Sequence, residues 1–340
     1  MSGGAAPRRS WRYRPGPTLW PLVALGLLLA YNGVRTPNFL HIEVRDGRLF
    51  GTTVDILHRG TPVMLLATGM ALVIATAGVD LSVGAVMAIT GAVAALLLTR
   101  TAQPVPVVVA GALAVSVAAG AWNGVLVAAL GLQPIVATLV LLVAGRGIAQ
   151  LLTDGMIITF ERPGFAAIAG GAALGVPVTV FIAAGVVLLT ILATRGTVLG
   201  LQIEAVGGNE EASRLAGIDP ARTKLLVYGF SGLCAGIAGL IATADIKAAD
   251  SNNCGLFLEL DAILAVVIGG TSLSGGRANL PGAIVGALVM QTVTTMIYAQ
   301  GRGVEYTLVV KAAAVAAVCL LQSDQLRAVL RRRGGRLRRA

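Results

Sequence analysis

Long apolar runs separated by short polar segments dominate this sequence. Several approach the roughly 20 residues that a helix needs to cross the hydrocarbon core of a bilayer. Only 12% of the residues are charged and 56% are hydrophobic, whereas a soluble domain carries roughly a quarter charged residues. We therefore predict an all-α, polytopic membrane protein with Gly-rich interruptions. The ten expected transmembrane helices are 19–34, 62–77, 85–99, 105–130, 134–152, 176–194, 224–244, 258–268, 280–298 and 306–321.

Basic tails, residues 1–17 and 323–340, flank the expected transmembrane domain, residues 18–322. Together they account for the net charge of +10. Basic segments beside membrane helices remain in the cytoplasm, and an even number of spans places both tails there. Nucleic-acid binding is disfavoured, because the basic residues flank apolar spans. The first apolar run also resembles a cleaved signal peptide, but no small-residue cleavage site follows Tyr31 and Asn32.

A polar, glycine-punctuated island, residues 206–222, interrupts the apolar pattern after the sixth expected span. Asn209 is suited to cap a helix, and Glu210 and Glu211 then lie in the first turn, where the helix dipole favours negative charge. Gly217 suits the left-handed position that ends such a helix. We predict a short, rigid helix outside the membrane, on the cytoplasmic side, that docks to a partner. An ordinary capped loop is the alternative.

A short glycine and serine motif occurs twice. Residues 78–84 and 270–276 share the pattern Gly-x-x-Leu-Ser-x-Gly, and each copy lies between two apolar runs. The copies are either tight hairpins or helix breaks inside the membrane, a device that transporters use to direct free backbone amides at a cavity. By the count of spans, both copies face the same side.

Asp80, in the first copy, is a carboxylate between two apolar runs. A charged group at the bilayer centre costs about 2.5–3.5 kcal/mol on insertion scales. We expect Asp80 to cap the helix that follows, with Ser82 assisting. The alternative is a residue of a gate or of the transport pathway.

Other polar side chains fall within or at the ends of the expected spans. Buried amides need partners, so each amide either joins two helices or hydrogen-bonds a transported sugar. An ion pair between Lys311 and Asp261 is suggested by their charges alone, and Arg146 is a further ionisable residue in a span. The pathway candidates are Asp80, Ser82, Asn123, Gln133, Gln150, Asp261 and Gln291.

Enzyme motifs are mostly missing. The sequence has no HExxH and no GxxxxGK[ST], so the chain is not its own P-loop ATPase. Residues 229–232 match the GxSG of intramembrane serine proteases, but that chemistry needs a base beside the serine, and both histidines precede the second long span. Gly232 with Gly236, and Gly282 with Gly286, have the spacing of close-packing helix faces. We expect no catalytic residue, metal or cofactor.

Four collinear segments resemble the permease subunit of ribose-type ABC sugar importers. They are IATAGVDLSVGAVMAITGAVAA (74–95), WNGVLVAALGLQPIVATLVLLVAGRGIAQ (122–150), EAVGGNEEASRLAGI (204–218) and LELDAILAVVIGGTSLSGGRANLPGAIVGAL (258–288). The resemblance covers most of residues 55–320. Two further segments, DGRLFGTTVDIL (46–57) and AADSNNCGLFLELDAI (248–263), look most like the galactofuranose-type permease.

This resemblance implies a bacterial inner-membrane protein that imports a monosaccharide, such as galactofuranose or a related furanose or pentose. It implies two permease subunits, identical or different, a separate ATPase subunit that binds the ATP, and a periplasmic sugar-binding protein. The ATPase would contact the coupling segment, residues 203–222, through Asn209, Glu210, Glu211, Arg214 and Gly217. Selectivity would reside mostly in the binding protein, so we expect only weak sugar binding along the pathway.

The rival interpretation is a secondary transporter or channel for a small polar solute, which needs no ATPase. Such a carrier requires ionisable groups that form an ion or proton relay inside the membrane. Asp80, Arg146 and Lys311 are scattered along the sequence and form no such chain. The importer is therefore the favoured interpretation.

Overall fold

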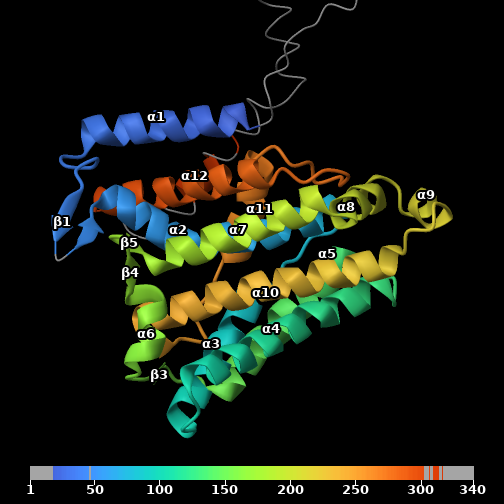
Figure 1. Cartoon of the computed structure of the whole chain (residues 1–340), viewed down its shortest axis with the longest axis horizontal. Helices are drawn as coiled ribbons and strands as arrows, with labels where there is room; N and C mark the ends of the chain where they lie inside the picture. The colour runs from blue at the N-terminus through green and yellow to red at the C-terminus, as the bar shows by residue number, and fades with distance from the viewer. Residues whose placement is uncertain (1–17, 46, 302–305, 307–308, 314–315, 317–340) are drawn as a thin grey trace, which may run out of the picture.

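The protein is described by a computed structural model, which places residues 18–45, 47–301, 306, 309–313 and 316. Its longer helices run side by side (Figure 1). Within these residues, seven helices are long and apolar enough to cross a membrane: α2 (Thr52–Ala75), α3 (Val83–Arg100), α4 (Val105–Ala128), α5 (Pro134–Leu152), α7 (Val178–Gly196), α10 (Pro220–Ile246) and α12 (Leu280–Ala299). The expected helical, multi-pass architecture is therefore confirmed.

Shorter elements connect these helices. The remaining helices of the described residues are α1 (Leu19–Arg35), α6 (Pro163–Gly170), α8 (Val198–Gly208), α9 (Glu210–Leu215) and α11 (Leu258–Ile268). Antiparallel strand pairs join β1 (Glu43–Arg45) to β2 (Arg48–Phe50), β3 (Ile158–Thr159) to β6 (Ala248–Ala249), and β4 (Ala172–Ala173) to β5 (Val176–Pro177). The expected all-α class agrees with this mostly helical structure, and the connectors add short ladders in which their backbone groups pair with each other.

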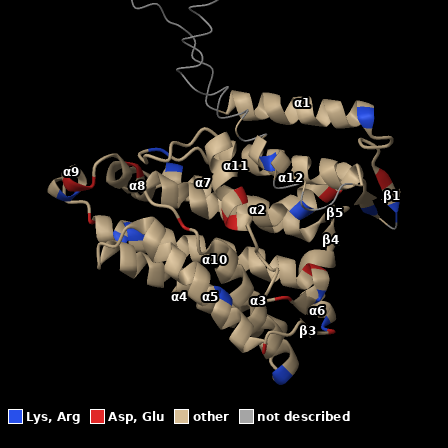
Figure 2. Cartoon of the chain, turned by 180° about the vertical axis from the view of Figure 1, so that it is seen from behind, with Lys and Arg blue, Asp and Glu red and all other residues tan. Residues whose placement is uncertain are grey.

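The bundle has two distinct ends (Figure 1). Helix α9 lies at one end, and the strands gather at the other; we call these the α9 end and the strand end. Many of the charged residues lie towards the two ends, and most of the ribbon between them is uncharged (Figure 2). This distribution suits a bundle whose middle lies in hydrocarbon, where charge is costly.

The described residues do not establish ten spans. Helix α1 has 17 residues and α11 has 11, fewer than the roughly 20 that cross a bilayer. Most of the expected span 306–321 and both basic tails lie outside the described residues. Helix α2 begins at Thr52, ahead of the apolar span 62–77, because Pro62 does not break it. Pro62 cannot donate to the carbonyl of His58, but the Thr61 hydroxyl does so at 2.7 Å.

Prolines mark the starts of five helices in the described part of the chain. Helices α4, α5, α6, α10 and α12 each carry proline at their first or second position. Proline suits these positions because the first N–H groups of a helix have no partner within it. The chain therefore re-enters the bundle at defined points.

Helix α10 lies in the interior of the bundle and packs against α4, α2 and α3. Its contact with α4 is a backbone contact, because a Cβ on Gly232 would lie 2.9 Å from the Cα of Gly120. One turn along α10, a Cβ on Gly236 would overlap the side chain of Ser116. The spacing of Gly232 and Gly236 therefore forms the close-packing face that it predicts.

We expect Gly232→Ala to destabilise the protein, because the added methyl group would separate α10 from α4 and overpacking costs about 1–3 kcal/mol. Gly229→Ala is the matched control on the same helix, since a Cβ there meets no atom within 4 Å. Thermal unfolding in detergent should show a lower Tm for Gly232→Ala only. Equal Tm values for the two variants would contradict this account of the helix contact.

Candidate functional site

Helix α9 is the short helix expected within residues 206–222. The Asn209 side chain accepts a hydrogen bond from the Ala212 N–H at 2.9 Å, and Gly217 adopts a φ of +83° just after the helix. Residues 206–208, however, belong to the last turn of α8. The island is therefore the end of one helix followed by a second, with Asn209 between them.

Charged side chains cover the exposed surface of α9. Glu211 forms an ion pair with Arg214, and Glu210 accepts from the Lys224 ammonium of α10 at 2.6 Å. Leu215 is 83% exposed at the end of the helix. Short caps and an ion pair to α10 hold α9 rigidly, while its charges and one leucine face outward.

Asp80 is the centre of a buried polar cluster that joins three helices. Its carboxylate accepts from the Ser82 hydroxyl at 2.6 Å and from the Ser231 hydroxyl of α10 at 2.8 Å. Asn123 of α4 donates to Ser82 at 2.8 Å and to Asp80 at 3.5 Å. We call Asp80, Ser82, Asn123 and Ser231 the Asp80 cluster. These bonds compensate for part of the cost of burying the carboxylate.

Asp80 does not occupy the position directly before α3, where a helix-capping residue is expected. The residue before α3 is Ser82, and its side chain makes no capping hydrogen bond. Asp80 lies two residues earlier and accepts from the Ser82 N–H at 3.0 Å. Asp80 is also 1% exposed, so in this conformation it holds helices together and does not face solvent.

Ser231 is the serine of the protease-like sequence 229–232. Its hydroxyl donates to Asp80, and its side chain is fully buried. Gly232 beside it provides the contact with α4. The bond to Asp80 therefore accounts for Ser231, and the contact with α4 accounts for Gly232. Sequence reasoning missed Ser231 as a cluster member, because its partner is 151 residues away.

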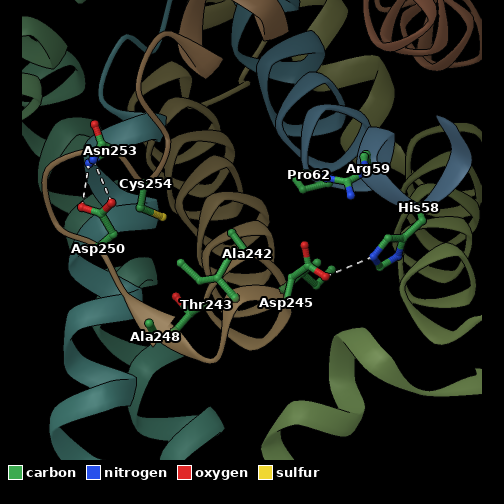
Figure 3. A pocket seen from close by; sticks show the side chains of 12 residues that line it. His58, Arg59, Pro62, Ala242, Thr243, Asp245, Ala248, Asp250, Asn253 and Cys254 are labelled. Atoms are coloured by element: carbon green, nitrogen blue, oxygen red, sulfur yellow. Dashed lines mark hydrogen bonds and ion pairs between the residues drawn. The ribbon is translucent and has the colours of Figure 1, made fainter. Parts of the chain in front are cut away.

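Two cavities with charged residues in their walls lie at the strand end, on either side of the first turns of α2, and share Arg59 and Pro62 as wall residues. The first has a volume of about 310 Å³ and is bounded by α2, α10 and the segment 248–254. Figure 3 shows Asp250, Asn253 and Cys254 on one side of it and Asp245 with His58 on the other. The volume lies near the lower limit for small-ligand pockets, about 300 Å³.

His58 joins the helices around this first cavity. Its Nδ1 lies 2.8 Å from the Thr179 hydroxyl of α7, and its Nε2 lies 3.4 Å from the Asp245 carboxylate of α10. His58 therefore sits near the start of helix α2, before the apolar span 62–77. Arg59 follows it and contributes a guanidinium to both cavities.

The second cavity, about 350 Å³, collects two of the expected pathway residues. Asp261 of α11 and Gln291 of α12 both line it, together with Lys311. Lys311 donates to Asp261 at 2.5 Å, so the ion pair that the charges suggested is formed. We call the two cavities together the strand-end vestibule.

The wall formed by residues 250–257 is anchored to α5. Arg146 donates to the carbonyl groups of Ser251 and Cys254, at 3.1 and 2.6 Å. Gln150 donates to Asn252 at 2.8 Å. These two polar residues of α5 thus fix a vestibule wall and do not line either cavity.

Asp250, in the same wall, is held in its charged form. Burial acts to raise its pKa, but hydrogen bonds from Asn253 and Asn252 outweigh burial and hold the pKa below the ordinary value for aspartate. Asp250 lies outside the membrane-spanning helices, and its carboxylate therefore presents negative charge to the first cavity at neutral pH.

The seven pathway candidates fall into separate places. Asp80, Ser82 and Asn123 lie in the Asp80 cluster, and Asp261 and Gln291 line the vestibule. Gln150 supports the vestibule wall, and Gln133 is exposed just before α5, at the opposite end. Sequence reasoning missed His58, Arg59 and Asp245 as vestibule residues, although charged residues early in a span, such as Arg59, were a usable signal.

Comparison with known proteins places this chain among transport permeases. The family described as branched-chain amino acid transport system / permease component matches residues 52–319. The galactofuranose transporter permease protein of Escherichia coli (strain K12) is 51% identical over 320 residues, which cover 94% of this chain and 93% of that protein.

Other relatives are named as import permeases for different sugars. The fructose import permease protein of Bifidobacterium longum is 41% identical, over 90% of this chain and 88% of that protein. The ribose import permease protein of Escherichia coli (strain K12) is 38% identical, over 89% and 93%. No solved structure matches the chain. The chain therefore belongs to the permease-component family of membrane transport systems and, as its motifs predicted, to the ribose-type ABC import permeases within it.

Proposed function

We propose that this permease imports a monosaccharide, galactofuranose or a related furanose or pentose, and that the sugar enters at the strand end and leaves at the α9 end. The 51% identity to a galactofuranose transporter permease carries the choice of sugar. The vestibule at the strand end supports the direction of entry. It is open to solvent, whereas the Asp80 cluster is buried.

The chemistry of the vestibule suits a neutral, polyhydroxylated solute. Its charged residues have both signs, with Arg59 and Lys311 near Asp245, Asp250 and Asp261. Several of these groups already have partners in the protein, such as the Lys311–Asp261 pair. A sugar hydroxyl group would exchange with them at little net gain, because a typical hydrogen bond contributes only about 0.5–1.5 kcal/mol. Weak binding of this kind allows the sugar to leave again.

The orientation follows from charge. The basic tails, residues 1–17 and 323–340, support a cytoplasmic location of both termini by the positive-inside rule. Thr18, beside the first tail, accepts a hydrogen bond from Asn279, in the loop between α11 and α12 at the α9 end. The α9 end thus faces the cytoplasm of a bacterium, and the strand end faces the periplasm across the inner membrane.

Three protein partners complete the importer. A cytoplasmic ATPase subunit binds the ATP and contacts residues 203–222, in particular Asn209, Glu210, Glu211, Arg214 and Gly217. A periplasmic sugar-binding protein docks at the strand end and supplies selectivity. A second permease subunit, identical or different, and the lipid bilayer cover the apolar surfaces of α4, α5 and α7, which are mostly exposed in the single chain. No contact with nucleic acid is needed.

The energy source separates this importer from a secondary carrier. Membrane vesicles that contain the permease, its ATPase and its binding protein should take up labelled galactose, whose solutions contain the furanose form, when ATP is supplied and the proton gradient is collapsed. Labelled ribose tests the pentose alternative. Uptake that stops with the gradient and ignores ATP would exclude an ATP-driven mechanism.

Exchanging the charges of α9, as Glu211→Arg with Arg214→Glu, should prevent co-purification with the ATPase. The exchanged residues still pair with each other at i and i+3, so the helix remains stable while its surface charges are reversed. Glu43→Arg with Arg45→Glu, at the strand end, is the matched control, because these residues also form an exposed pair. Normal assembly of the α9 variant would refute the proposed docking surface.

Removing the cation that both cavities share should weaken transport without affecting assembly. We expect Arg59→Gln to lower uptake about tenfold, the effect of losing one charge-assisted hydrogen bond of about 1.5 kcal/mol. Arg45→Gln, at the same end but outside both cavities, should transport normally. Co-purification with the ATPase should be unchanged in both. Wild-type uptake by Arg59→Gln would remove Arg59 from the pathway.

A further inference from the structure

The second copy of the glycine and serine motif, residues 270–276, meets the chain just before the first copy, at the α9 end. The Gly276 N–H donates to the Ala75 carbonyl at 2.9 Å, although the two residues are far apart in sequence. Figure 1 shows the loop between α11 and α12 extending beside α8. The loop that contains residues 270–276 is therefore in direct backbone contact with the last residue of α2.

Gly207, in the last turn of α8, lies against the end of α2, where the first loop begins, and against the second loop. A Cβ on Gly207 would overlap the carbonyl group of Ala75 and would lie 2.8 Å from the backbone nitrogen of Gly276. From the second loop, a Cβ on Gly275 would lie 2.8 Å from the Gly207 carbonyl oxygen and 2.9 Å from the Ala77 Cβ. We call these five residues the glycine junction. No side chain separates the three backbones there.

The junction connects the docking helix to both walls of the pathway. Only Asn209 separates α8 from α9. From the first loop, Asp80 bonds to α4 and α10, and α2 leads back to Arg59 in the vestibule. From the second loop, α12 leads to Gln291. Close-packed contacts of this kind transmit displacement, because they have no free space to absorb it.

We propose that the glycine junction transmits the movement of α9, driven by the ATPase, to the two repeat loops and through them to the transport pathway. This inference rests on the proposed function, in which α9 is the ATPase contact. Gly207 is then a positioning residue, because it holds α8 against the end of α2 and the second loop and touches neither ATP nor sugar. The second copy of the motif supplies Gly275 and Gly276 to the junction.

Two neighbouring glycines provide a matched test. Gly207→Ala would push α8 away from the Ala75 carbonyl, whereas a Cβ on Gly208 meets no atom within 4 Å. Each variant is assembled with the ATPase and binding protein in vesicles, and uptake of labelled galactose is measured together with ATP hydrolysis. We expect Gly207→Ala to hydrolyse ATP as Gly208→Ala does, but to import at least about tenfold less sugar per ATP, within the range of known coupling energies.

An equal ratio of sugar to ATP in the two variants would overturn the inference. If Gly207→Ala is not recovered as an intact complex, a second measurement tests the inference. Spin labels are attached to Gly208→Cys with Ser274→Cys, and in a separate sample to Gly208→Cys with His41→Cys, in a chain whose own cysteines are replaced by alanine. Distances are measured without ATP and with ATP trapped.

The junction predicts that the distance between positions 208 and 274 stays constant while the distance between 208 and 41, at the strand end, changes. A change in the first distance, or none in the second, would overturn the inference. Failure of the proposed function gives a different result: the wild-type permease would then neither bind the ATPase nor depend on ATP. If the wild-type permease couples transport to ATP normally and Gly207→Ala behaves like Gly208→Ala, only the proposed role of the glycine junction is refuted.

Discussion

Direct contact between helix backbones is the constraint on which this structure depends. Lipid is as apolar as leucine, so burying apolar side chains gives membrane helices little reason to associate, and close packing must do so. Helix α10 achieves this at Gly232, where it touches Gly120 of α4, and at Gly239, where a Cβ would lie 2.9 Å from the Cα of Met87 in α3. The interior position of α10 follows from these contacts, and α4, α2 and α3 are arranged around it.

Hydrogen bonds between polar groups in the bundle hold its loops and helices together in addition to close packing. A backbone group or carboxylate that is buried without a partner is costly, so the loops that interrupt the helices pair with one another and with side chains. Asp80 accepts bonds from Ser82 and Ser231, and the Ala75 carbonyl accepts one from Gly276. These bonds fix the loops, and thereby place a rigid set of contacts between α9 and the vestibule.

The local elements of this site could be predicted with good accuracy, since their signals lie within a few residues. Asn209 caps α9 and Gly217 ends it, as the spacing of the island indicates. The vestibule was harder to predict, because its walls come from α2, α10, α11 and α12. Arg146 illustrates the difficulty: an arginine within a span suggests a pathway, yet its guanidinium holds the loop that contains Ser251 and Cys254.

The sequence by itself determined a membrane protein, the position of most of its long helices, the short helix α9 and the family. These properties depend on composition, periodicity and motifs that are continuous along the chain. Only the tertiary structure decided that the end of α2 and the loop between α11 and α12 meet Gly207, that Asp80 and Ser231 are partners, and that Asp261 pairs with Lys311. Such pairings depend on which helices are neighbours, and neighbours are chosen by backbone fit between segments far apart in the chain, which no local pattern specifies.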